Sequence, residues 1–313
     1  MGTEEWPIMT ETSYPVSHSP IHIAVLADPH FTQKRHGTWK MLHKTEELVQ
    51  RAVKDLENDR TGEFDLVVFA GDLTSSGRTA DYDAFDAIVS EIDIPSVAIP
   101  GNHDINTKVA PDQSITVNQF AERYNVDGYP FHHTVGDVSV IGLDSASLSV
   151  GEPPEDWGGA ISEHQIRWLR KKLPDISNPI IITHHNLCRL SEHPDEFPWD
   201  QFPIENNKEV KEVLVQNGVP LAVSAHHHLP GVNVIRNQGA EQQELIEVMS
   251  PAMCSFPQGY MKITVDTDGT VVRYIPLSNR SESLSALNAA EAGLPRSKRI
   301  AKLAQKRLIS LFG

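Results

Sequence analysis

The sequence contains little cysteine: Cys188 and Cys254 are the two thiols among 313 residues. Two are too few for a disulfide framework, and neither has a second cysteine at the short spacing that binds zinc. Because free cysteine usually packs as a small hydrophobe, we expect both thiols to be reduced and buried. The sequence thus argues against a disulfide-stapled fold and against a cysteine-based structural zinc site.

Long hydrophobic runs are also missing. No stretch approaches the roughly 18 consecutive apolar residues that cross a bilayer. Residues 1–20 are polar and acidic, and they carry neither the basic and apolar regions of an export signal nor a myristoylation motif. We therefore expect a cytoplasmic protein whose residues 1–20 form a flexible segment.

Positive charge is scarce, since 27 Lys and Arg residues face 42 Asp and Glu residues and give a net charge of −15. Proteins that bind nucleic acid need a basic surface, so nucleic acid is not expected as a partner. The charge remains compatible with a small anionic substrate that is held by metal ions.

Short apolar runs alternate with helical patterns in the first third of the chain. Residues 21–27, 65–70 and 96–99 predict buried strands, and helical stretches near 39–58 and 79–92 separate them. This order predicts a parallel sheet covered by helices. Further strands are predicted at residues 138–143, 179–183 and 220–225, and antiparallel strands near 232–235, 245–249, 260–265 and 271–275.

Two local signals refine this picture. Ser162 and Gln165 have the spacing of a capping box, which predicts a helix from there through Leu173. His132 and His133 lie on a predicted edge strand, and we assign them a structural role.

Polar side chains follow five of the predicted strands, where each strand ends. The third strand, for example, runs into Gly101-Asn102-His103-Asp104. Any one such cluster is compatible with an ordinary turn or a structural histidine. Five strand ends that deliver Asp, Asn and His instead indicate a site, because the crowded charged groups need cations to neutralise them. These residues are Asp28, His30, Asp72, Asn102, His103, His184, His226 and His228.

The donor types suggest the cofactor. Carboxylate, imidazole and amide oxygen ligands suit Mn, Fe or Zn. Even seven of these eight residues are too many ligands for one ion. They suit two ions about 3.5 to 4 Å apart that share a bridging carboxylate, an arrangement that activates water and stabilises in-line displacement at phosphorus.

The five strand-end blocks resemble, in the same order, the signature of the calcineurin-like metallophosphoesterases. The blocks are Asp28-x-His30, Gly71-Asp72, Gly101-Asn102-His103-Asp104, His184-His185 and Ala225-His226-His227-His228. The resemblance covers residues 21–228, and residues 250–260 are similar to the bacterial and archaeal cyclic-nucleotide phosphodiesterase branch. It implies an α/β fold, a four-layer α/β/β/α sandwich with mixed sheets over residues 21–278, followed by a C-terminal helical extension over residues 279–313.

The resemblance also implies a role for each block. The first metal ion would be bound by Asp28, His30 and His228, the second by Asn102, His184 and His226, and both by the bridging Asp72. His103 would assist the leaving group without binding metal, and Asp104 would orient His103. A hydroxide that bridges the metals would attack the phosphorus.

Two blocks depart from the family pattern. Ala225 replaces the usual Gly, and residues 186–188 replace the usual prolines, so the pocket wall can differ. His184 is preferred over His185 as the ligand because it directly follows a strand. His227 would point away from its neighbours in an extended segment.

The implied function is a dinuclear metal-dependent phosphoesterase that hydrolyses phosphodiester bonds, with cyclic nucleotides among the candidate substrates. One alternative is hydrolysis of phosphomonoesters or nucleotide anhydrides at the same metals. Another is an interaction scaffold that keeps the fold without catalysis. Substrate contacts are expected from the loop residues Arg35, His36, Arg189 and His193.

The C-terminal stretch combines a basic face with an apolar one. Ile300, Leu303 and Leu308 fall on one side of a helix over residues 296–311 that carries Lys and Arg but no acidic residue. Such a helix can dock on its own domain or on a second copy of the chain, or it can bind a membrane or another partner.

Overall fold

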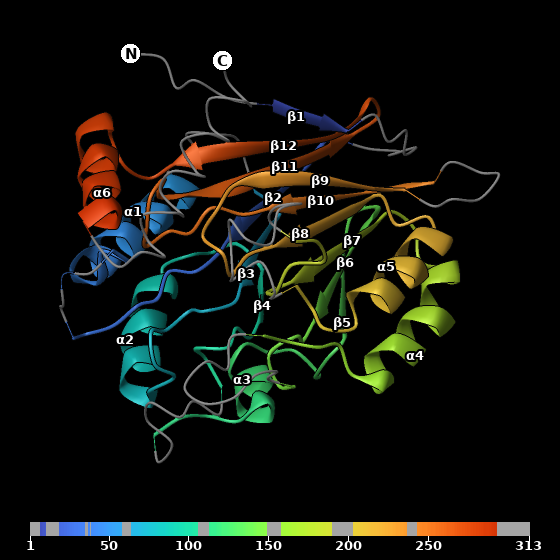
Figure 1. Ribbon diagram of the computed structural model, residues 1–313, viewed down its shortest axis with the longest axis horizontal. Coiled ribbons are helices and arrows are strands. Elements are labelled where there is room, and N and C mark those ends of the chain that lie inside the picture. The colour runs from blue at the N-terminus through green and yellow to red at the C-terminus, as the bar shows by residue number, and fades with distance from the viewer. Residues whose placement is uncertain are drawn as a thin grey trace.

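The computed structural model describes residues 7–10, 19–34, 37, 39–57, 64–105, 113–148, 158–189, 203–236 and 243–292. In these residues two six-stranded sheets face each other, and helices cover both outer faces (Figure 1). Each sheet mixes parallel and antiparallel strand pairs. The expected four-layer α/β/β/α sandwich is therefore confirmed.

The first sheet has the strand order β1-β12-β11-β2-β3-β4. Its parallel part consists of β2 (Ile21–Leu26), β3 (Leu66–Ala70) and β4 (Ser96–Ile99), as the apolar runs predicted. β11 (Gly259–Asp266) and β12 (Gly269–Pro276) form an antiparallel hairpin beside β2. β1 (Pro7–Thr10) pairs with β12, so this piece of the N-terminal segment belongs to the sheet, which the sequence did not predict.

The second sheet has the strand order β5-β6-β7-β8-β10-β9. β6 (Val138–Leu143), β7 (Pro179–Thr183) and β8 (Leu221–Ser224) are parallel, and β5 (Phe131–Val135), which carries His132 and His133, is an edge strand as predicted.

The last two strands of this sheet differ from the prediction. β9 (Gly231–Arg236) and β10 (Glu244–Met249) pair antiparallel, but β10 also pairs parallel with β8. The expected antiparallel pairing is present between β9 and β10, but the sequence did not predict the parallel pairing of β10 with β8, which arises because β9 takes the sheet edge. β10 then returns between β9 and β8, in the direction of β8.

Helices pack on the outer faces through alternate strand residues. α1 (Thr45–Glu57), which follows the short η1 (Leu42–Lys44), and α2 (Thr79–Val89) cover the first sheet. α4 (Glu163–Lys172), continued by η2 (Leu173–Asp175), and α5 (Asn207–Gln216) cover the second. α3 (Val117–Arg123) begins with a capping box. Because side chains alternate along a strand, Ile23 and Val25 fill the space between the sheets while Ala24 and Leu26 meet the helices.

The final described helix, α6 (Arg280–Ala292), docks beside α1 (Figure 1). Its buried Leu287 and Ala290 pack against Trp39 and Phe256. Residues 293–313, with the predicted basic helix, lie outside the described residues. Among those described, no helix combines the length and the apolar character needed to cross a membrane.

An ion pair fastens α6 to α1. The guanidinium of Arg51 donates to both carboxylate oxygens of Glu282, each at 2.7 Å. These hydrogen bonds lower the pKa of Glu282 from 4.5 to about 2. Because the folded pKa lies below the unfolded one, the pair stabilises the protein above pH 4.5, and this contribution is lost as the pH falls toward 2.

Replacement of Glu282 by Gln should therefore destabilise the protein at neutral pH and have less effect in acid. Urea unfolding of the wild-type protein and Glu282→Gln at pH 7 and pH 3.5 measures the difference. A difference in unfolding free energy that stays constant between the two pH values would contradict the assignment.

Candidate metal centre

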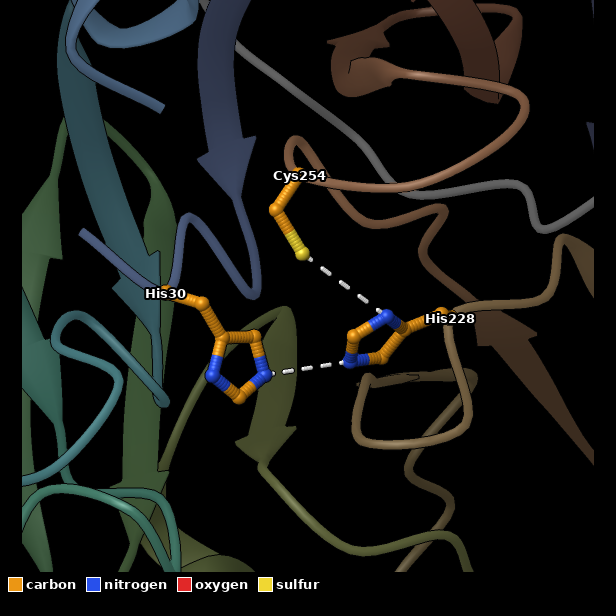
Figure 2. A group of neighbouring side chains, drawn as sticks. All are labelled: His30, His228 and Cys254. Atoms are coloured by element: carbon orange, nitrogen blue, oxygen red, sulfur yellow. Dashed lines mark hydrogen bonds between the residues drawn. The ribbon is translucent and has the colours of Figure 1, made fainter. Parts of the chain in front are cut away.

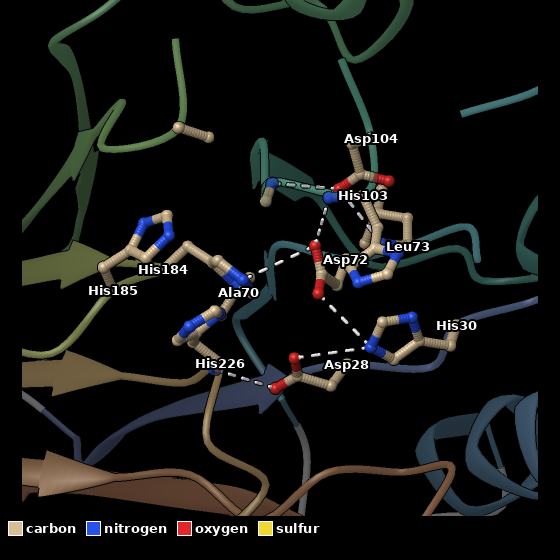
Figure 3. Close-up of polar contacts among 12 residues, drawn as sticks. Asp28, His30, Ala70, Asp72, Leu73, His103, Asp104, His184, His185 and His226 are labelled. Atoms are coloured by element: carbon tan, nitrogen blue, oxygen red, sulfur yellow. Dashed lines mark hydrogen bonds and ion pairs between the residues drawn. The ribbon is translucent and has the colours of Figure 1, made fainter. Parts of the chain in front are cut away.

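The predicted ligands come from adjacent parallel strands whose carboxyl ends point to one place. β2, β3 and β4 lead into Asp28, Asp72 and Asn102, and β7 and β8 lead into His184 and His226. The two groups of strands belong to facing sheets, so their ends meet across the sandwich (Figure 3). Residues separated by up to 198 positions in the chain thereby come into contact.

The backbone at this junction is strained. Nine described non-glycine residues have a positive φ, and five of them are predicted ligands: Asp28 (50°), His30 (44°), Asp72 (52°), His226 (65°) and His228 (59°). Left-handed backbone is uncommon for residues that carry a Cβ, although Asp and His adopt it more often than most, and it is typical of functional sites. Hydrogen bonds between the strand ends hold it, among them Asp28 N to Gly71 O at 3.1 Å and His30 N to Asp72 O at 2.9 Å.

Two glycines precede the ligands because the chains approach closely there. A Cβ at Gly71 would lie 2.5 Å from Nδ1 of His184, and one at Gly101 would lie 2.2 Å from Oδ1 of Asp72. The Gly-Asp and Gly-Asn blocks of the sequence thus reflect packing against other ligands of the same centre.

The first ligand cluster joins Asp28, His30, Asp72 and His228. His30 Nε2 lies 3.2 Å from Asp72 Oδ2, 3.2 Å from His228 Nε2 and 3.9 Å from Asp28 Oδ1. His228 Nε2 lies 3.4 Å from Asp28 Oδ1. Atoms that bind one ion at about 2.0 to 2.2 Å are separated by about 3.0 to 3.5 Å from neighbouring ligand atoms. Most of these separations suit one shared metal ion.

The second cluster lies on the other side of the same carboxylate. His184 Nε2 is 3.4 Å from Asp72 Oδ1, and one ligand atom each of Asp72, His184 and His226 lie within 4.8 Å of one another. The two oxygens of Asp72 therefore face one cluster each, which is the geometry of a bridging carboxylate.

Unpartnered polar atoms mark where cations fit. Asp28 Oδ1, Asn102 Oδ1, His184 Nε2 and both ring nitrogens of His226 are buried without a hydrogen bond. Buried polar atoms normally have such a partner, and metal ions would supply it here. The donor set of carboxylate, amide oxygen and imidazole fits Mn, Fe or Zn.

The charge states of the histidines agree with this fit. Burial lowers the pKa of His30, His226 and His228, so their rings are neutral at pH 7, as metal ligands must be. Burial also opposes the charge of His184, but the Asp72 carboxylate prevails and raises the pKa of His184 to about 9. A metal ion would displace that proton.

His103 lies beside the first cluster, next to His30. Its ring stands edge-on to that of His30, with 4.7 Å between centroids, and its Nδ1 lies 2.9 Å from the carbonyl oxygen of Ser75. Since a carbonyl only accepts, Nδ1 carries a hydrogen and Nε2 is left for other chemistry. Burial and the Lys40 ammonium lower the pKa of His103 to about 4.

Asp104 does not orient His103, contrary to expectation. Its carboxylate accepts hydrogen bonds from the N–H groups of Leu73, Thr74 and Gly101 at 3.0 to 3.1 Å and from the hydroxyl of Tyr82 at 3.0 Å. The turn after β4 sends the two adjacent side chains in different directions, and the Ser75 carbonyl takes the orienting role. Burial, together with the Asp72 charge, raises the pKa of Asp104 to about 7.

The side chains of His184 and His185 point to different partners. His184 faces Asp72, whereas His185 Nδ1 lies 2.8 Å from Ser145 Oγ, and the His185 ring packs against His226 at 4.5 Å. His227 is also absent from the clustered ligand atoms. The reasoning for His227 assumed an extended segment, but residues 226 and 228 have left-handed backbone.

Of the predicted substrate contacts, Arg189 is exposed. Arg35, His36 and His193 lie outside the described residues.

The two cysteines are free, but only Cys254 is buried. Cys188 is half-buried, contrary to expectation, because it lies in the loop after β7.

Several contacts of the centre were not predicted. Cys254 Sγ lies 3.8 Å from Nδ1 of His228 (Figure 2), and Ser255 Oγ lies 2.8 Å from the same nitrogen. Lys40 Nζ lies 3.1 Å from His30 Nε2, and the Trp39 ring lies 5.2 Å from that of His228. These residues carry no sequence signal beyond a basic loop and a segment similar to one family branch.

Gln165 and Glu247 hold the loops that follow strands of the second sheet. The predicted capping box is only half formed, because Ser162 caps the helix but the side chain of Gln165 bonds the backbone N–H and C=O of Asp144 instead. The buried Glu247 accepts from the N–H groups of Leu187 and Cys188, which fixes the loop that follows His184.

Comparisons with known proteins point to one family. A sequence model described as calcineurin-like phosphoesterase matches residues 21–230. The chain is 26% identical over 199 residues to the 3',5'-cyclic adenosine monophosphate phosphodiesterase CpdA of Escherichia coli K12, covering 63% of this chain and 65% of that protein. It is 25% identical over 215 residues to a probable cyclic nucleotide phosphodiesterase of Synechococcus, covering 66% and 74%.

A third relative, a probable glycerophosphodiester phosphodiesterase GpdQ of Arcobacter nitrofigilis, is 31% identical over 139 residues, which are 42% of this chain and 45% of that protein. The matches to the E. coli and Arcobacter proteins thus span less than two thirds of those relatives.

Solved structures share the fold. A purple acid phosphatase from yellow lupin seeds superposes with a TM-score of 0.60 at 15% identity, over 85% of this chain and 53% of that one. GAP50 of Plasmodium superposes with a TM-score of 0.52 at 12% identity, over 86% and 94%.

Proposed function

Because the chain belongs to the calcineurin-like phosphoesterase family, we propose that it hydrolyses phosphodiester bonds at a centre of two metal ions, with cyclic nucleotides as candidate substrates. The observation that carries the proposal is Asp72, whose two carboxylate oxygens face separate ligand clusters. The relatives named as cyclic nucleotide phosphodiesterases support the substrate class.

The chain's own residues would hold the ions. Asp28, His30 and His228 would hold one ion, Asn102, His184 and His226 the other, and Asp72 both. The ions would acidify water and neutralise the charge of the phosphoryl group.

His103 is the residue proposed to act on the leaving group. The Ser75 carbonyl holds its Nδ1–H and therefore fixes the ring. Nε2 is then free to carry a second proton when an anionic phosphoryl group lies beside the ring and raises its pKa. That proton would pass to the leaving oxygen as the phosphorus–oxygen bond breaks.

A substrate panel tests the proposal. Protein stripped with a chelator and reloaded with Mn, Fe or Zn is assayed with bis-p-nitrophenyl phosphate, p-nitrophenyl phosphate and cyclic AMP. We expect hydrolysis only after metal is returned, and a higher kcat/KM for diesters than for the monoester. A preference for the monoester would contradict the diester assignment, and hydrolysis of none of them by the loaded protein would favour a non-catalytic scaffold.

A further inference from the structure

A lysine that is not among the predicted metal ligands reaches the proposed metal centre from the segment just before η1. Lys40 precedes η1, and its Nζ lies 3.1 Å from Nε2 and 3.5 Å from Nδ1 of His30. The side chain is half-buried. Its ammonium group therefore lies at the ring of a residue that faces both Asp28 and Asp72.

The charge of this lysine acts on three histidines at the centre. It is among the causes that lower the pKa of His30, His103 and His228, which belong to three different strand ends. An ammonium group beside a metal centre repels the ions, so it does not help to bind them. Its charge is useful instead for an anion that approaches the same centre.

The neighbouring tryptophan fixes where the lysine lies. One side of Trp39 meets the ring of His228 at 5.2 Å, and Trp39 also packs against Leu287 and Ala290 of α6. α6 is in turn held by the pair of Arg51 and Glu282. Helix α6 lies beyond residues 21–230, which match the family model, so this support comes from outside the matched region.

We propose that Lys40 binds a non-bridging oxygen of the substrate's phosphoryl group, and that Trp39, packed on α6, positions Lys40 for this contact. The reaction in which the contact is used rests on the proposed function, but the binding of a phosphate anion can be measured without it.

The test is calorimetric titration of inorganic phosphate into the metal-loaded full chain, with metal content measured on the same samples. Loss of one charged hydrogen bond predicts that Lys40→Met weakens phosphate binding by about 10- to 100-fold at unchanged metal content. Lys40→Arg should be intermediate, since it keeps the charge. Lys44→Met is the matched control, because Lys44 lies in η1 and its charge acts on Glu282 rather than on the centre.

The outcomes separate the possible failures. Unchanged phosphate affinity in Lys40→Met overturns the proposal, and so does a loss of metal, which would assign Lys40 to building the centre. If the wild-type protein binds phosphate but hydrolyses no diester, the proposed function fails while the comparison of Lys40 variants still decides this inference. With an active protein, Lys40→Met should also raise KM for the diester.

A double-variant cycle tests the role of α6. Leu287→Ala removes apolar contact with Trp39, so it should weaken phosphate binding in the wild-type background. In the Lys40→Met background it should have no further effect, because the residue that it positions is gone. Equal losses in both backgrounds would overturn the positioning role, since a general structural defect is additive.

Discussion

Asp72→Asn is expected to lose bound metal and to reduce kcat/KM for the best diester by about a thousandfold or more. Asn keeps the shape of the side chain but removes its negative charge and one of the two oxygens that face the ligand clusters. Metal analysis of the purified variant and steady-state kinetics measure both effects. Asp86→Asn is the matched control, because Asp86 lies on α2 and bonds Arg123 and Tyr124.

His103→Gln provides the contrast that separates metal binding from proton transfer. Because His103 Nδ1 bonds the carbonyl oxygen of Ser75 and His103 is assigned to the leaving group rather than to the ions, this variant should retain its metal while turnover falls. An Asp72→Asn protein that still held two ions per chain would contradict the bridging assignment. Loss of metal in His103→Gln would contradict the division of roles.

Asp104→Ala is expected to destabilise the fold by about 3 to 5 kcal/mol. The change removes the acceptor for three buried N–H groups, and it leaves the hydroxyl of Tyr82 with the backbone carbonyl of residue 104 alone. Urea unfolding with the slope checked for constancy gives the free energy of unfolding.

Asp104→Asn should fall between the wild-type protein and the alanine variant. Burial and the Asp72 charge raise the pKa of Asp104 to about 7, so its site disfavours the charged form, but Asn offers one acceptor oxygen instead of two. The folded Asn variant should keep its metal content. If Asp104→Ala were as stable as the wild-type protein but inactive, Asp104 would have a catalytic rather than a structural role.

The ligand positions could be predicted from the sequence because parallel strands have a simple signature. A short apolar run buried on both faces ends where polar residues begin, and adjacent parallel strands bring those ends together. Asp28, Asp72 and His184 follow this rule. The strand order along the chain was enough to expect the two sheets, once the family resemblance was included.

Contacts made through turns and loops could not be predicted in the same way. Asp104 is adjacent to His103, but the direction of its side chain depends on the turn that brings β4 beside the residues after β3. Lys40 reaches His30 because α6 and Trp39 hold its loop, and these segments are separated by about 250 positions. The short β1 could not be predicted because its pairing partner, β12, lies near the other end of the chain.

The left-handed backbone at five ligand positions has a consequence for protein engineering. Each such conformation costs on the order of 1 to 2 kcal/mol for a residue with a Cβ, and glycine would relieve it. Laboratory evolution that selects only for thermal stability would therefore favour glycine at Asp28, His30, Asp72, His226 and His228. It would produce a more stable protein that has lost its proposed metal ligands. Any campaign to stabilise this protein needs a metal-retention screen in every round.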